Sequence, residues 1–403
     1  MSDTITSTSG QFTTTIQDDG NLVLSDWGAP YWGSGTVRPI RPNPNPPPAP
    51  SVPPVAPLPM IRVDGTRFVD ALTGAPWKYR GCSAFRLLDM FLAGQDIGPF
   101  CRWAKRNTIG VLRVLGMYHG GIGSFRPAHV AAYYERLGLF LDAVAVHGLS
   151  VEFVVFADVQ LGAADGLNLH THYRRVRDIL RGRRGTLLEV CNEPFKNGMD
   201  PQQVYEAGPD LAQALGIYAV VDGTLPHADY VTVHTPRDGE WPRKAKDLLE
   251  LSRLGWAGFT PVGVPCVGDE PMGIGPEQPG RRSMVAQDHG EHHACCALFG
   301  AGSTIHGDFG IACRVPDAEE QKCVDAIVQA WDAVPDECQL WTYTRGGLDD
   351  CPLENNGLRT YAMLDGNRAV AVRIRATAPP VARAGWRIID QRGPGGCVVE
   401  LAR

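Results

Sequence analysis

The sequence predicts an α/β fold in which eight parallel strands close into a (β/α)8 TIM barrel. From Val63 onward, short apolar runs alternate with amphipathic stretches, and eight alternations over about 270 residues fit a barrel of this kind. A doubly wound open sheet would need a glycine-rich phosphate loop after its first strand, and residues 81–85 do not supply one. We also expect a short β-rich N-terminal head on a proline-rich linker and a small C-terminal antiparallel β module.

The expected barrel strands are short runs rich in apolar and β-branched residues. They cover residues 77–85, 110–117, 149–158, 186–193, 218–222, 230–235, 262–270 and 303–310. Between them, apolar residues recur at helical spacing, which predicts helices on the outside of the barrel. These helices cover residues 130–147, 172–183, 201–215, 244–254, 284–299 and 318–333.

Composition excludes several classes of function. Among 403 residues, 44% are hydrophobic and 20% are charged, and the net charge of -6 provides no basic face for nucleic acid. The first residues lack the positive start and apolar core of a Sec signal peptide, and no apolar stretch approaches membrane-spanning length. We therefore expect cytoplasmic synthesis, with association with a virion or release by a non-Sec route as further options, and no membrane partner.

The 11 cysteines are spaced irregularly and form no Cys-x-x-Cys pair, which disfavours a disulfide framework and a zinc ribbon. His289, His292, His293, Cys295 and Cys296 crowd one predicted helix, but their spacing matches no established zinc pattern. We expect an ordinary helix there, with no metal and no cofactor.

Proline-rich residues 39–59 should form an extended spacer that separates residues 1–38 from the rest. The head carries polar residues at alternate positions of a predicted strand, Gln17, Asp19 and Asn21, followed by Val23. This pattern resembles the mannose-binding motif of bulb-type lectins, although Ser25 stands where that motif has Tyr. The alternative is a strand used for oligomer or virion assembly.

Two predicted strands end in the same way. The apolar run that reaches Val190 is followed by Asn192, Glu193 and Pro194, and residues 262–271 end in Glu270 and Pro271. The carboxyl ends of parallel strands carry the chemistry of such barrels. Two opposed glutamates are what cleavage of a glycosidic bond needs, one to protonate the leaving oxygen and one to attack or stabilise the sugar carbon.

These strand ends resemble those of the clan A glycoside hydrolases, in particular the family-five cellulase-like group, over residues 60–335. The resemblance implies that Glu193 is the general acid/base and Glu270 the nucleophile of a retaining double displacement. It also implies that Asn192 binds the sugar 2-hydroxyl, that Arg113 orients the nucleophile and keeps it ionised, and that His234 is the strand-six histidine.

The sequence departs from that family at two places. Pro236 stands where the family has a tyrosine, and the tryptophan of the eighth strand is missing, with His306 and Phe309 as candidates to replace it. The further candidate substrate-binding residues lie in loops: Trp241, Tyr118, His119 and Asp158.

Residues 336–403 are expected to form the C-terminal β module, because two alternating strands flank Asp365 and Gly366, a strong hairpin signal.

The leading function is a retaining glycoside hydrolase that cleaves a polysaccharide or surface glycan. The alternative is a non-catalytic or weakly catalytic glycan-binding structural protein, such as a phage tail or capsid component.

Overall fold

The structure is a computed structural model with two compact units, Met1–Pro54 and Val55–Arg403. In the first unit it describes four strands, β1 (Asp3–Thr6), β2 (Phe12–Ile16), β3 (Leu22–Asp26) and β4 (Ala29–Gly33). In the second it describes residues 57–120, 123–194, 199, 206, 211–218, 228–234, 263–271, 273–275, 285–345, 350–354 and 359–403.

The first unit is a four-stranded antiparallel sheet in the order β1, β2, β3, β4. Of the four lectin-like positions, Val23 lies in β3, where its backbone pairs with Thr15 and Gly33. Gln17, Asp19 and Asn21 lie outside the described residues. Their role in binding sugar therefore stays a prediction.

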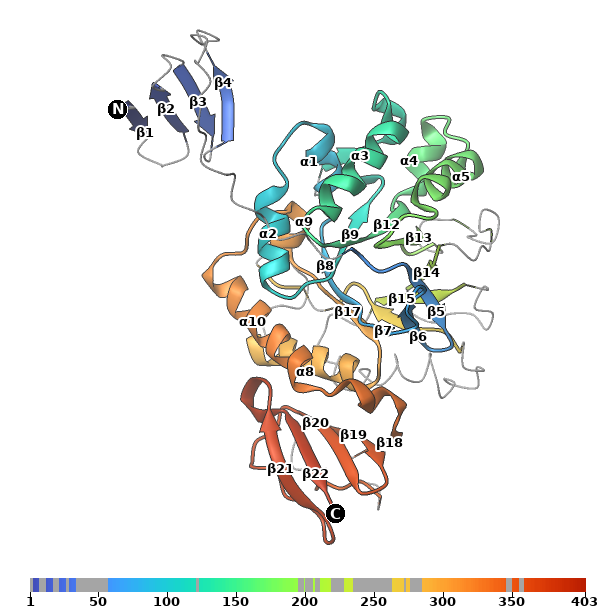
Figure 1. Ribbon diagram of the computed structural model, residues 1–403, viewed down its shortest axis with the longest axis vertical. Coiled ribbons are helices and arrows are strands. Elements are labelled where there is room, and N and C mark those ends of the chain that lie inside the picture. The colour runs from blue at the N-terminus through green and yellow to red at the C-terminus, as the bar shows by residue number, and fades with distance from the viewer. Residues whose placement is uncertain are drawn as a thin grey trace, which may run out of the picture. The chain divides into compact units, whose positions relative to one another are not determined.

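The second unit contains the expected closed barrel of eight parallel strands (Figure 1). The strands are β8 (Arg80–Ser83), β9 (Val111–Leu115), β12 (Ser150–Phe156), β13 (Thr186–Cys191), β14 (Gln213–Tyr218), β15 (Tyr230–His234), β16 (Cys266–Gly268) and β17 (Gly302–Ile305). The barrel closes because β17 pairs with β8 in parallel, with Ser303 opposite Arg80 and Ile305 opposite Cys82.

The fifth strand departs from the prediction. The sequence favoured residues 218–222, but β14 covers Gln213–Tyr218, where residues 201–215 were expected to be helical. Gln213 is a buried polar residue in this strand, and its side chain is satisfied by the hydroxyl of Tyr173 and by the carbonyl of Glu206. A glutamine and a glycine within the strand weaken its apolar pattern, which explains the misplacement.

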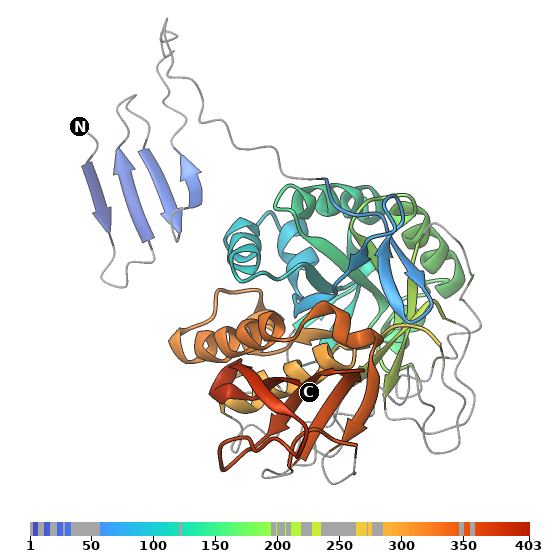
Figure 2. The same ribbon diagram turned by 60° about the horizontal axis from the view of Figure 1, so that its bottom comes forward.

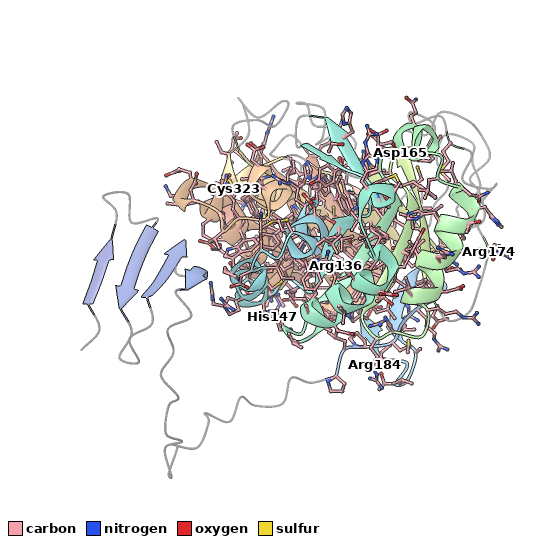
Figure 3. The ribbon with its side chains drawn as sticks, turned by 90° about the horizontal axis from the view of Figure 1, so that it is seen from above. Arg136, His147, Asp165, Arg174, Arg184 and Cys323 are labelled. Atoms are coloured by element: carbon pink, nitrogen blue, oxygen red, sulfur yellow. The ribbon has the colours of Figure 1, made fainter. Side chains whose placement is uncertain are left out.

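Helices surround the barrel. They are α1 (Leu87–Leu92), α2 (Gly98–Arg106), α3 (Tyr133–Ala145), α4 (Val159–Ala164), α5 (Leu169–Leu180), α8 (Ala286–Leu298), α9 (Asp308–Ala312) and α10 (Ala318–Ala333). Asp317 starts α10 with a capping box, because its side chain accepts from the amides of Glu319 and Glu320 and the Glu320 side chain accepts from the amide of Asp317. Arg174 on α5 and Arg184 after it lie at the outer edge of the barrel (Figure 3).

Four of the six predicted helices correspond to α3, α5, α8 and α10, and predicted residues 244–254 lie outside the described residues. Among the described helices, none is both long and apolar enough to cross a membrane.

The amino ends of the barrel strands are closed by a small antiparallel sheet, β5 (Ile61–Asp64), β6 (Arg67–Asp70) and β7 (Pro76–Trp77). Phe68 from this sheet packs edge-on against Tyr230, with 5.1 Å between the ring centroids. Phe68, Tyr79, Val111 and Leu187 belong to one buried apolar cluster with Tyr230. This apolar cluster lies at the amino ends of the strands, and barrels of this kind carry their chemistry at the opposite, carboxyl ends.

The C-terminal residues form a five-stranded antiparallel sheet in the order β18, β19, β20, β22, β21. Its strands are β18 (Thr342–Arg345), β19 (Arg359–Asp365), β20 (Arg368–Ile374), β21 (Arg387–Arg392) and β22 (Val398–Ala402). The predicted hairpin is present, since β19 and β20 are joined at Gly366, which has a φ of 53°. The sheet packs on α8 and α10 (Figures 1 and 2), and Phe299 meets Tyr361 at 5.5 Å between centroids.

Candidate active site

The two glutamates singled out from the sequence lie just beyond the carboxyl ends of their strands. β13 ends at Cys191, and Glu193 follows two residues later with a φ of 46°, in the left-handed region that residues with side chains rarely adopt. Glu270 also lies two residues beyond its strand, because β16 ends at Gly268. Strained backbone of this kind is concentrated at functional sites, and here it sits at the residue that precedes Pro194.

Arg113, on β9, connects these strand ends from the barrel interior. Its guanidinium is completely buried and donates from Nε and Nη2 to the two carboxylate oxygens of Glu189, at 2.8 and 3.0 Å. Nη1 donates to Oε1 of Glu270 at 2.9 Å, and Nη2 donates to Oδ1 of Asn192 at 3.0 Å. Nη2 also lies 2.9 Å from Oδ2 of Asp269. An arginine so placed stabilises the charged form of Glu270.

A second buried layer lies beneath this arginine. Glu152 on β12 accepts from the hydroxyls of Tyr79 at 2.5 Å and Tyr230 at 2.6 Å, and it lies 3.8 Å from Nε of Arg113. Burial raises the pKa of the Glu152 carboxyl, although Arg113 and the two hydroxyls lower it. The tyrosines satisfy a carboxylate that would otherwise be costly to bury.

His234, the last residue of β15, lies between the two glutamates. Its Nδ1 is 2.9 Å from Oε1 of Glu193, and its Nε2 is 3.6 Å from Oε1 of Glu270. Because a single imidazole ring joins them, these carboxylate oxygens are closer than about 9.5 Å, the upper end of the range over which paired carboxylates hydrolyse glycosides. Glu193, His234 and Glu270 are 8%, 8% and 7% exposed, so each reaches the surface of the site.

The crowding of acids around two cations shifts several pKa values. Burial raises the pKa of Glu189 to about 8, even though Arg113 opposes this effect. Burial also acts to raise the pKa of Asp269, but Arg113 and His234 lower it below its usual value. Burial acts to lower the pKa of His234, but Glu270, Asp269 and Glu193 raise it to about 10. His234 is therefore a cation at neutral pH.

Sequence reasoning missed three acids of this site, Glu152, Glu189 and Asp269. Each stands inside or at the end of an apolar run, where it was counted as part of the strand. Glu189 could have been found, since it lies four residues before Glu193, and alternate residues of a strand share one face. Asp269 could have been noticed as the neighbour of Glu270.

Three further predicted residues, His306, Phe309 and Tyr118, are buried in the structure. His306 follows β17 and is buried, with its Nδ1 2.9 Å from the hydroxyl of Ser83. Phe309 is fully buried against Trp103, so it does not replace the missing tryptophan as a surface for sugar. Tyr118 is buried as well and donates to Asp89 at 2.7 Å. Trp241 lies outside the described residues.

The histidines of α8 serve the core. His293 lies 2.8 Å from the hydroxyl of Ser303, which also accepts from the indole of Trp331. Burial lowers the pKa of His289 to about 4 and that of His292 to about 3, so both are neutral at physiological pH. Among the described residues, no group of three or more His, Cys, Asp or Glu side chains is placed to hold a metal ion.

The geometry thus provides two carboxyl groups that reach the surface of the site. Glu270 binds Arg113, and Glu193 contacts His234. An ionised carboxylate held by arginine can act as a nucleophile, and a carboxyl group opposite it can exchange a proton with a leaving group or water. This set of groups suits acid/base chemistry at a carbon held between Glu193 and Glu270.

Comparison with known proteins identifies the class of fold. One glycoside hydrolase structure matches 85% of this chain and 96% of its own, with 9% identity and a TM-score of 0.56. A glycoside hydrolase family 5 protein from Bacteroides vulgatus matches 85% of this chain and 92% of its own, with 8% identity and a TM-score of 0.55. A β-glucanase from Saccharophagus degradans matches 69% and 96%, with 13% identity and a TM-score of 0.50.

The chain thus shares the (β/α)8 barrel fold of glycoside hydrolases, among them a member of family 5. The sequence matches no family model, and comparison with curated protein sequences finds no match.

Proposed function

We propose that this protein is a retaining glycoside hydrolase that cleaves O-glycosidic bonds of a polysaccharide or surface glycan. The observation that carries the proposal is the placement of Glu193 and Glu270 on either side of His234, with Arg113 bound to Glu270. The shared fold supports it, since such barrels carry their chemistry at the carboxyl ends of their strands.

In the first step, the Glu270 carboxylate attacks the anomeric carbon and forms a glycosyl ester. The bond from that carbon to the leaving oxygen breaks, and Glu193 gives its proton to that oxygen. In the second step, water attacks the same carbon, Glu193 takes a proton from the water, and the ester bond to Glu270 breaks. The two inversions return the anomeric carbon to its starting configuration.

The residues around the glutamates have supporting roles. Arg113 holds Glu270 ionised and fixes its direction through a charge-assisted hydrogen bond. Asn192, held by the same guanidinium, is oriented next to the acid/base for a hydrogen bond to the sugar 2-hydroxyl. We propose β-glucans as the first substrates to test, because the barrel-sharing proteins include a β-glucanase.

Proton NMR of the first products tests the mechanism directly. Soluble β-glucan is incubated with the protein, and the anomeric signals are followed before mutarotation. We expect the product to appear first in the substrate's own β configuration. First appearance of the α anomer would show inversion and exclude Glu270 as a covalent nucleophile.

Glu270→Gln should abolish turnover while the circular dichroism spectrum stays unchanged, because a neutral amide cannot form the glycosyl ester. Glu193→Gln should be rescued in part on aryl glycosides whose leaving groups need no proton. Asp288→Asn, which alters a buried aspartate paired with Arg375, is the matched control and should retain full turnover. Unchanged activity in Glu270→Gln would contradict the proposal.

A further inference from the structure

The carboxyl end of the barrel contains more buried acid than its arginine can balance. Among the described residues, four carboxylates lie within 4.0 Å of Arg113: Glu152, Glu189, Asp269 and Glu270. Glu152 is also satisfied by two tyrosines, and Glu189 takes two of the arginine's donors. Asp269 and Glu270 both lie against the remaining donors of the same guanidinium, and His234 is a second cationic side chain beside them.

Asp269 lies where it can bind that second cation. Its side chain has no exposed surface, whereas those of Glu193 and Glu270 reach the site. Oδ2 of Asp269 lies 2.9 Å from Nη2 of Arg113 and 3.4 Å from Nε2 of His234. The same imidazole faces Glu193 with its other nitrogen. Asp269 therefore contacts His234 from a position with no exposed surface.

We propose that Asp269 is a positioning residue that keeps His234 doubly protonated and directs its Nδ1–H toward Glu193. This inference rests on the proposed function for its catalytic meaning, but the contacts among Asp269, His234 and Glu193 are independent of substrate. A buried imidazolium needs an acceptor on each nitrogen and a nearby negative charge, and this site supplies an oxygen of Glu193 at Nδ1 and the carboxylates of Asp269 and Glu270 near Nε2.

The charged groups that face His234 come from three described elements. Glu193 follows β13, Asp269 and Glu270 follow β16, and Arg113 on β9 reaches the ring only through those two acids. The pKa of His234, raised to about 10, agrees with this surplus of negative charge. With its charge fixed, His234 serves as a constant hydrogen-bond donor while the proton on Glu193 changes during the reaction.

A neutral His234 could exist in two tautomers, and only one donates to Glu193. Asp269 removes this ambiguity, because its carboxylate near Nε2 and the Glu193 oxygen at Nδ1 both accept from N–H donors. The charge of Asp269 therefore defines the hydrogen bond that orients the acid/base.

Nitrogen-15 NMR of the histidine side chains tests the proposal without any need for turnover. The full chain is labelled with 15N-histidine, and the His234 signals are identified by their loss in His234→Gln. In the wild type we expect both ring nitrogens to stay protonated up to about pH 9. In Asp269→Asn the midpoint should fall by at least about 1 pH unit, the effect of removing an opposite charge within 4–6 Å.

Two further variants complete the test. Asp269→Glu keeps the charge and should restore most of the His234 midpoint, and Asp288→Asn should leave that midpoint unchanged. With an active substrate in hand, Asp269→Asn should lower kcat at least about tenfold, which corresponds to one pKa unit of lost interaction. Its KM should change less than about twofold, because Asp269 does not reach the substrate surface.

The outcomes separate this inference from the proposed function. A wild-type His234 that titrates near its ordinary pKa of 6.5 would overturn the role of Asp269, whether or not Asp269→Asn folds. An unchanged midpoint in folded Asp269→Asn would overturn it as well. If no glycan is cleaved but the midpoint moves as expected, the positioning role stands and the glycosidase proposal fails.

Discussion

Arg113 and Glu189 form a double hydrogen-bonded ion pair across the barrel interior, with Nε to Oε2 at 2.8 Å and Nη2 to Oε1 at 3.0 Å. They lie on β9 and β13, which are separated in the sheet by β12. The same guanidinium reaches Glu270 beyond β16, so one side chain joins strands from both halves of the barrel. Its geometry matters as much as its charge, because Lys lacks the planar fork that binds a carboxylate with two bonds.

Arg113→Lys should destabilise the fold by about 3–5 kcal/mol, since an ammonium cannot satisfy Glu189 and Glu270 together and a buried charge is left unpaired. Urea unfolding followed by fluorescence measures this free energy. Arg174→Lys is the matched control. Arg174 lies on the exposed surface of α5 and pairs with Glu206, and loss of this surface ion pair should cost only about 0–1 kcal/mol of stability. Equal effects in the two variants would contradict the interior role of Arg113.

The free energy of unfolding should depend on pH through His234. Its folded pKa of about 10 exceeds the ordinary value of 6.5, so its stabilisation is fully present below pH 6.5 and is lost as pH rises through 10. We therefore expect the difference in stability between the wild type and His234→Gln to shrink between pH 6.5 and 10. The burial that raises the pKa of Glu189 acts in both proteins, so it does not enter this difference.

Denaturant unfolding at pH 6, 8 and 10 measures that difference. A gap that stays constant, or that widens toward pH 10, would show that His234 is not held as a cation.

The N-terminal unit should be dispensable for folding of the barrel when the truncated chain keeps Leu58 and Pro59. The amide of Gly185 donates to the carbonyl of Pro59 at 2.8 Å, and Arg184 donates to the carbonyl of Leu58 at 3.1 Å. A chain that begins at Val55 should therefore keep its melting temperature within about 2 °C, whereas one that begins at Ile61 should lose these bonds and melt lower. A large loss of stability in the longer chain would show that the head packs on the barrel.

The role of the head can be tested with the same truncated chain. A sugar-binding head should hold the protein on insoluble glycan, so its removal should weaken pull-down on the polymer and leave turnover of a small soluble glycoside unchanged. An assembly strand should instead change the elution volume in gel filtration. Full-length protein on the same polymer and the same column is the control.

Removing residues 336–403 should unfold or aggregate the protein. Phe299 on the barrel side packs against Tyr361 in the C-terminal sheet, and Val334, Val370 and Val372 belong to the same buried cluster. Without the sheet this apolar face of α8 and α10 would be exposed to water. We expect the truncated chain to be insoluble or to bind a hydrophobic dye, and a soluble monomer with an unchanged melting temperature would contradict this.

The sequence predicted the barrel well because short apolar runs, typical of strands, alternate along it with stretches in which apolar residues recur at helical spacing. Glu193 and Glu270 were singled out because each follows an apolar run and precedes a proline, whereas Arg113, in the middle of β9, and His234 were assigned through the family resemblance. The sequence did not locate β14, where the buried Gln213 is satisfied only by tertiary partners. Nor did it show that Phe309 is buried, because whether an aromatic faces substrate or core depends on the helix packed behind it.

The role of Asp269 could not be predicted from the sequence either. Its position beside Glu270 is plain in the sequence, but its effect depends on a ring 35 residues away along the chain, in His234. Contacts that join several strands depend on how far each strand slides past its neighbours, and a single sequence does not record that register.

The burial of α8 has a consequence for how the chain folds. Asp288, Glu291, His292 and Cys295 all lie within this helix, and all are buried, so polar and apolar residues alike are enclosed between the barrel and the C-terminal sheet. A helix with so little amphipathic pattern gains little from forming early on its own. It should become ordered only when both neighbours are in place, which couples barrel and sheet into one cooperative transition and makes their union a late event in folding.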